Sequence, residues 1–145
     1  MARPIADAAA DAVEAAAERD REAFDTAVGR LAGFDVAQVG LLLGTVVRHA
    51  LEERHPDGLD SDDVRDTLTA VVSRALEWLD TVDPQVVLLL LAGALGVHEP
   101  DPDDPPVKAD VSARHAVLLV AHLVDAGGFA TRLERAAREL AQNAE

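Results

Sequence analysis

The feature that most constrains this chain is a run from Val86 to Val97 that contains no polar side chain. The run follows Asp83-Pro84, which favours a helix start because aspartate accepts hydrogen bonds from free N–H groups and proline at the first helical position loses none. It is well short of the roughly 20 apolar residues that a membrane span needs. A soluble helix without a polar face is expected to be buried on every side. The sequence therefore predicts a central apolar helix over about 84–97, enclosed by neighbouring helices or by a second subunit.

Helical periodicity also runs through the rest of the chain, and no segment alternates convincingly like a strand. Asp35, Asp60 or Ser61, and Asp110 stand where helix caps are expected. Residues 98–106 include four prolines, so they are predicted to form a loop. Besides the apolar helix we expect an acidic, alanine-rich first helix over about 4–32 and further helices over about 35–54, 61–80, 110–126 and 130–143.

A chain of 145 residues has the size at which one hydrophobic core is expected. Aromatic residues make up only 3% of it, so leucine, valine and alanine must fill that core. We expect an all-α fold, a compact bundle of five to six helices around the central apolar helix. The domain prediction is a single helical domain over 1–145, with its helical core over about 35–145.

The first predicted helix has an acidic face and an alanine face, because its acidic residues recur every three or four positions. An alanine face lets another helix approach closely but buries little area per residue. We therefore expect this helix to contribute weakly to the core and to offer a surface for self-association. The acidic residues are Asp7, Asp11, Glu14, Glu18, Glu22 and Asp25.

The net charge of −14 argues against a polyanionic partner. Nucleic-acid binding needs clustered cations, and the one basic stripe, Arg132, Arg135 and Arg138, is interleaved with Glu134 and Glu139. We predict neither a nucleic-acid nor a membrane partner. The chain has no cysteine, which removes disulfides and thiolate sites, and its N-terminus lacks the apolar segment of a secretory signal. A cytoplasmic protein is expected.

Glycines in two predicted helices mark a candidate interaction surface. Gly40 and Gly44 lie one turn apart inside the helix over about 35–54, where each costs about 1 kcal/mol relative to alanine. Either another helix crosses tightly there or a ligand lies against the exposed backbone. Ala92, Gly93 and Gly96 form a similar small-residue surface on the apolar helix. These five residues are the predicted contacts of a homodimer or of a protein partner.

Histidines provide the candidate metal ligands. His115 and His122 are seven residues apart and so share one helical face, while His49 and Glu53 lie one turn apart on another helix. If the two helices face each other, these four side chains form a nitrogen and oxygen ligand set. The sequence lacks the Glu-x-x-His pairs of di-iron bundles and the His-Glu-x-x-His of metalloproteases. The alternative is that the histidines simply form hydrogen bonds to neighbouring groups.

Motifs for catalysis are missing from the sequence. Ser61, Ser73 and Ser112 do not lie in a Gly-x-Ser-x-Gly turn, and no glycine-rich phosphate loop is present. We predict no catalytic residue and no cofactor, and we lean towards a protein that is not an enzyme.

The leading functional prediction is a non-enzymatic helical interaction or regulatory module of unknown pathway. The first alternative is a small-molecule-binding bundle, with an apolar pocket between the helices over about 35–54, 84–97 and 110–126 and with His49, His115 and His122 as polar anchors. The second alternative is the histidine and carboxylate metal site. An interaction module predicts a dimer or a captured partner, whereas a ligand-binding bundle predicts a closed apolar cavity.

Overall fold

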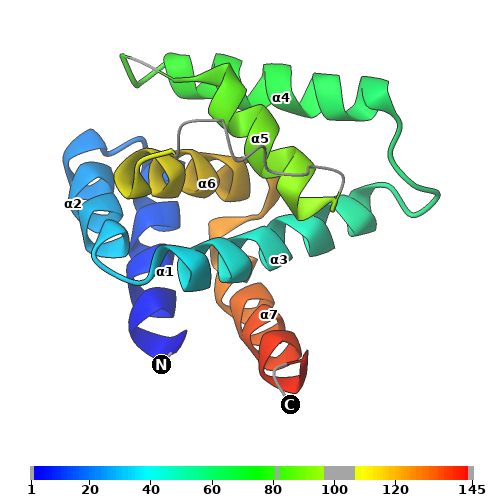
Figure 1. Ribbon diagram of the computed structural model, residues 1–145. Coiled ribbons are helices and arrows are strands. Elements are labelled where there is room, and N and C mark those ends of the chain that lie inside the picture. Colours follow the sequence, from blue (N-terminus) through cyan, green and yellow to red (C-terminus); the bar gives the residue numbers. More distant parts are fainter. Residues whose placement is uncertain (1, 81, 97–106, 144–145) are drawn as a thin grey trace.

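The computed structural model describes residues 2–80, 82–96 and 107–143, and within these ranges every regular element is helical. The all-α prediction is therefore confirmed. Figure 1 shows the arrangement of the elements in space. In chain order they are α1 (Ala2–Glu18), α2 (Arg21–Ala32), α3 (Val36–Arg54), α4 (Ser61–Leu76), α5 (Pro84–Ala94), α6 (Ala109–Leu123), the short 3-10 turn η1 (Ala126–Gly128) and α7 (Phe129–Asn143). The predicted loop over 98–106 lies outside the described residues.

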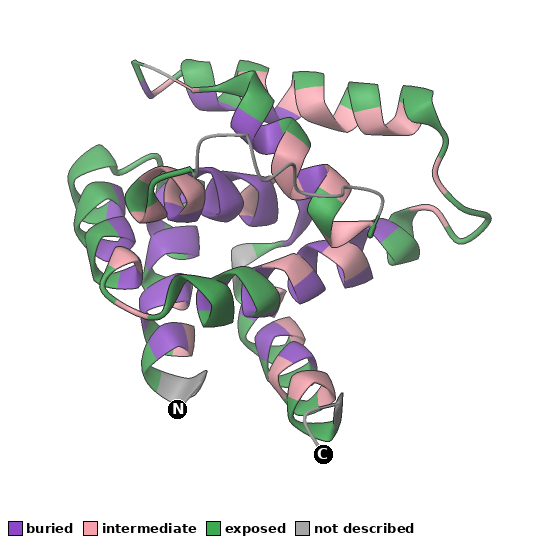
Figure 2. Cartoon of the chain, in the orientation of Figure 1, coloured by how far each residue is buried: buried purple, intermediate pink, exposed green. Residues whose placement is uncertain are grey.

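The most enclosed helix is α6, which packs against α1, α2, α3, α4 and α5. From Ala116 to Val120 every residue of α6 is buried, and these residues form one contiguous core with buried side chains of its neighbouring helices. Figure 2 shows how much of this central ribbon is coloured as buried. Burying several sides of one apolar helix removes a large aliphatic area from water, which is the main favourable term in folding.

The predicted central position of the apolar helix over 84–97 is not confirmed. The corresponding helix, α5, packs against α3, α4 and α6 and buries only Val86, Val87 and Leu91. Leu88 remains 38% exposed, and Gly93 is exposed as well. The physical reason is that apolar surface need not be buried completely, since more than half of a folded protein's surface is apolar.

The predicted first helix is in fact two helices, α1 and α2. The chain breaks at Arg19, whose φ of 57° lies in the left-handed region, and Asp20 then caps α2 by accepting a hydrogen bond from the Ala23 N–H at 3.2 Å. Sequence analysis missed this break because the break falls inside the regular acidic spacing. Aspartate is nevertheless a preferred N-cap residue, so Asp20 carried a readable signal.

The alanine face of α1 is buried inside the protein, contrary to the expectation that it contributes weakly to the core. Ala8, Ala9 and Ala12 are fully buried where α1 packs against α2, α6 and α7. Small side chains let these helices approach closely. Many van der Waals contacts between small side chains then replace the contacts of a few large ones. This face is therefore not free to bind a second subunit.

Most of the predicted helix starts are confirmed. Asp35 accepts hydrogen bonds from the Ala37 and Gln38 N–H groups at 2.9 and 3.3 Å, and Asp60 forms a reciprocal capping box with Asp63. Asp110 was expected to cap the helix over 110–126, but α6 begins one residue earlier, after Lys108, and Asp110 lies in its first turn. There a carboxylate still interacts favourably with the helix dipole.

Overpacking the alanine interface tests the packing of α1. We expect Ala12→Leu to lower the free energy of unfolding by about 1–3 kcal/mol, because extra methyl groups must be forced between closely packed helices. The control is Ala130→Leu on the exposed side of α7, which should change stability by less than about 0.5 kcal/mol. Urea unfolding followed by circular dichroism measures both. Equal stability of Ala12→Leu and the wild type would contradict this packing.

Candidate binding groove

An apolar groove of about 490 Å³ runs between α3, α5 and α6. We call it the α3/α5/α6 groove. Among the residues that the structure describes, the polar side chains that line it are those of Thr45, Arg48 and Ser112. Thr45 donates its hydroxyl to the carbonyl oxygen of Leu41 at 2.7 Å, so it is satisfied within its own helix. The apolar lining includes Phe34, Val39, Leu43, Leu90, Ala113 and Leu119.

Three of the five residues predicted for an interaction surface meet in this groove. Gly40 and Gly44 line it from α3, and Gly93 lines it from α5. A Cβ atom placed on any of these three glycines would meet no atom of the described ranges within 4 Å. The glycines therefore do not mark a tight crossing between the helices that the structure describes. Beside each of them the helix backbone is uncovered by any described side chain.

The other two predicted interaction residues lie on α5 or just beyond it. Ala92 is partly exposed on the helix and does not line the groove. Gly96 has a φ of 73° directly after the C-cap residue Leu95, a left-handed conformation that glycine commonly adopts at helix ends. The role of Gly96 in the structure is thus to end α5.

The α3 side of the groove carries two large exposed apolar side chains that sequence analysis did not single out. Val36 and Leu41 line the groove and are 56% and 59% exposed. Figure 2 shows the first turns of α3 largely in the colour of exposed residues. Single exposed leucines are common on proteins, but apolar side chains gathered beside a groove characterise binding surfaces. The helical wheel could have identified Leu41, because it lies off the buried arc of α3.

One cation stands at the edge of the groove and is already paired. The Arg48 guanidinium lies 2.6 Å from Glu139 Oε2 and 3.7 Å from Glu52 Oε1. The groove thus offers an occupant mainly aliphatic contact and exposed helix backbone. Such a lining is suited to binding an apolar surface. General acid–base catalysis would instead need titratable groups that face the substrate.

The predicted metal ligand His115 is committed to backbone hydrogen bonds. It is buried, its Nδ1 lies 2.8 Å from the Val111 carbonyl oxygen, and its Nε2 lies 2.9 Å from the Asp83 N–H. A neutral ring with the proton on Nδ1 satisfies both contacts, donating to Val111 and accepting from Asp83. His115 therefore ties α6 to the residue that caps α5.

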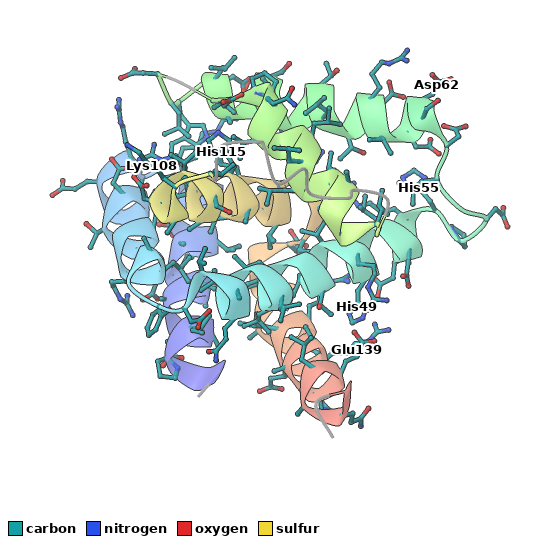
Figure 3. The ribbon with its side chains drawn as sticks, viewed as in Figure 1. His49, His55, Asp62, Lys108, His115 and Glu139 are labelled. Atoms are coloured by element: carbon teal, nitrogen blue, oxygen red, sulfur yellow. The ribbon has the colours of Figure 1, made fainter. Side chains whose placement is uncertain are left out.

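His49 and Glu53 both face α7, but they have different partners. The Nε2 atom of His49 lies 3.2 Å from Glu139 Oε2. Glu53 lies 2.6 Å from Arg132 and 3.3 Å from Arg135, and the hydrogen bond from Arg132 lowers the pKa of this carboxyl. Two members of the predicted basic stripe are thus paired with an acid. Figure 3 shows His49 beside Glu139, with His115 well away from both.

The fourth predicted ligand, His122, lies between α6 and α4. Its Nδ1 atom is buried and has no hydrogen-bond partner in the described part of the chain. Burial lowers the pKa of this histidine, and the guanidinium groups of Arg74 and Arg54 lower it further. The structure therefore does not bring His49, Glu53, His115 and His122 together. Across residues 2–80, 82–96 and 107–143, no three histidine, aspartate or glutamate side chains are grouped to hold a metal ion.

Comparison of the chain with protein-family models, with curated proteins and with solved structures gave no match. Within the described ranges no helix has both the length and the apolar character to cross a membrane.

Alanine substitutions distinguish an open groove from a tight helix crossing. We expect Gly40→Ala and Gly44→Ala each to raise the free energy of unfolding by about 0.5–1 kcal/mol, because alanine loses less backbone entropy in a helix and its Cβ meets open space here. Thermal and urea unfolding measure the change. Destabilisation by both substitutions would mean that another segment occupies the space beside α3.

The pKa of His122 predicts how stability depends on pH. Because the folded-state pKa lies below the ordinary value of 6.5, the unfolded chain binds this proton at a higher pH than the folded chain does. The free energy of unfolding should fall as the pH decreases from about 6.5 towards the folded-state pKa. We expect His122→Gln to flatten this part of the profile in urea unfolding at a series of pH values. An unchanged profile would contradict the enclosed position of the ring.

Proposed function

We propose that this protein is a non-enzymatic interaction module and that its α3/α5/α6 groove binds an amphipathic helix of a protein partner. The observation that carries the proposal is the open apolar groove with Gly40, Gly44 and Gly93 in its lining. Apolar grooves commonly take the apolar face of a helix, with anchor residues at spacings of three and four. Glycines in such a wall allow the partner's backbone to come close.

The exposed side chains at the groove favour a long occupant over a compact one. A docked helix of about 10–12 Å diameter can cover Val36 and Leu41 while its anchor residues enter the groove. Removing apolar area from water contributes roughly 25 cal/mol per Å² before the costs of association. This surface thus supplies the driving force that a transient helix-in-groove contact requires.

The net charge of the protein indicates which charge the polar face of the partner helix should carry. With a net charge of −14, the protein attracts cationic segments and repels acidic ones. An amphipathic helix with lysine or arginine on its polar face would be steered towards the groove by this field, and its association would slow as salt is added. Two copies of this chain repel each other for the same reason, which favours a different protein over a second copy as the occupant.

A small apolar ligand is a second candidate for the same groove. Its volume of about 490 Å³ lies within the range of roughly 300–1,000 Å³ that is typical of ligand pockets. The three histidines predicted as polar anchors do not line it, which leaves Thr45, Arg48 and Ser112 to orient a ligand. A compact ligand would also leave more of Val36 and Leu41 in water than a helix does.

The proposal is tested with a labelled model peptide of roughly four helical turns, with leucine and alanine on one face and lysine on the other. Fluorescence anisotropy at two salt concentrations measures its affinity for the protein. We expect binding that weakens with salt, and a loss of at least about tenfold in Gly44→Leu, whose side chain fills part of the groove. The matched control is Gly29→Leu on the exposed side of α2, where a Cβ also meets open space.

Three results would contradict a partner helix. The first is an absence of peptide binding, and the second is equal binding by Gly44→Leu and the wild type. The third is a wild-type dimer in analytical ultracentrifugation that Gly44→Leu dissociates, which would make a second copy the occupant. A peptide with glutamate in place of lysine should bind more weakly, which checks the role of charge separately.

A further inference from the structure

A second hollow, of about 260 Å³, lies where the C-terminal parts of α1, α4 and α6 meet. We call it the α1/α4/α6 hollow. Its charged and titratable lining residues are Arg19, Arg74 and His122, and no carboxylate of the described residues lines it. A lining without acids stands out in a chain with 27 acidic residues against 13 basic ones. The other lining residues are apolar: Ala16, Ala17, Val71, Ala75, Trp78, Leu118 and Ala121.

The positive charge in this hollow is only partly neutralised. Arg19 lies 2.8 Å from Glu77 at the surface, whereas Arg74 takes part in none of the ion pairs among the described residues. The charges that act on His122 are those of Arg74 and Arg54, and both disfavour its protonated form. The described lining of the hollow therefore carries a local excess of cations.

His122 carries an unused hydrogen-bonding atom at the same place. Its Nδ1 atom is buried and has no partner in the ranges that the structure describes. A buried polar atom without a partner costs about 1–3 kcal/mol, so native proteins seldom leave one unpaired without a role. Because the His122 ring lines the hollow, a carboxylate bound there would favour the protonated form of the ring.

We propose that the α1/α4/α6 hollow binds a small organic monocarboxylate, with its carboxylate on Arg74 and His122 and its apolar part against the alanines and Trp78. A guanidinium matches a carboxylate in shape and can donate two parallel hydrogen bonds. The alanine and leucine walls give an aliphatic body apolar contact, which an inorganic anion cannot use. The volume is below that of typical pockets for drug-sized ligands, which restricts the ligand to a few carbon atoms beyond the carboxylate.

The single tryptophan of the chain makes the hollow directly observable. Because Trp78 lines the hollow, its fluorescence should change in a saturable way when sodium butyrate is added at constant ionic strength. Sodium chloride and n-butanol serve as controls for charge alone and for the apolar part alone. We expect Arg74→Gln to weaken butyrate binding by at least about tenfold, the loss expected for one charge-assisted hydrogen bond.

The matched control variant is Arg65→Gln, because Arg65 and Arg74 are both exposed arginines of α4 but only Arg74 lines the hollow. Its butyrate affinity should remain within about twofold of the wild type, since exposed charges beyond a Debye length are screened. Equal butyrate binding by Arg74→Gln and the wild type would overturn the proposal. So would a response to inorganic phosphate without one to butyrate, which would identify an inorganic-anion site, or no saturable response to either probe.

The His122 ring provides a second readout that does not depend on fluorescence. The groups that act on it are Arg74 of α4 and Arg54 of α3, with the Arg19–Glu77 pair at the edge of the hollow. A bound carboxylate stabilises the protonated ring, so saturating butyrate should raise the pKa of His122 in NMR titrations. Arg74→Gln should abolish this upward shift, whereas Arg65→Gln should retain it. An unchanged His122 pKa in wild-type protein saturated with butyrate would also overturn the proposal.

Discussion

Enclosure of α6 by five other helices is the constraint on which the rest of the structure depends. Burial of its central stretch removes aliphatic surface from water on several sides at once. This burial also fixes the positions of the helices that cover it, among them α1, α2, α3 and α5. Because the chain has few aromatic residues, large side chains anchor the hydrophobic core at only a few positions. One of them is Phe24 of α2, which is fully buried and packs edge to face on Trp78 with ring centroids 5.1 Å apart. The remaining cohesion comes from many small aliphatic contacts.

Polar groups tie both ends of α6 to neighbouring segments and thereby shape the candidate sites. Near the beginning of α6, His115 accepts a hydrogen bond from the Asp83 N–H, which attaches the start of α5 to α6. At its end, the Arg54 guanidinium of α3 donates to the Leu123 carbonyl oxygen at 3.0 Å and satisfies one of the free acceptors of the helix terminus. With α5 attached at one end and α3 at the other, the α3/α5/α6 groove lies between them. His115, which resembled a metal ligand in the sequence, is thus a structural residue that holds α5 against α6 and does not itself line the groove.

The groove and the hollow use opposite faces of α6 and have opposite chemistry. Ala109, Ala113 and Ala116 face the apolar groove, and at 100° per residue Leu118, Ala121 and His122 lie on the other side of the helix. The groove has exposed backbone and aliphatic side chains, whereas the charged residues in the described lining of the hollow are cations. A partner helix in the groove and a small carboxylate in the hollow would therefore not compete for space. The two sites are nevertheless connected, because α6 lines both and α4 of the hollow packs against α5 of the groove.

The sequence by itself determined the helical class, most helix starts and the unusual glycines, because periodicity, capping residues and glycine act over one or two turns. It did not show that one helix ends before Asp20 and another begins there. Aspartate serves both as a helix cap and as a member of an acidic stripe, so the residue type does not distinguish the two. Which apolar helix is central was decided only by tertiary structure: α5 and α6 are both apolar, and long-range packing rather than composition enclosed α6. Tertiary structure also separated His49, His115 and His122, since a shared helical face says nothing about which neighbour that face meets. For the same reason the opening beside Gly40 and Gly44 could be found only in the folded chain.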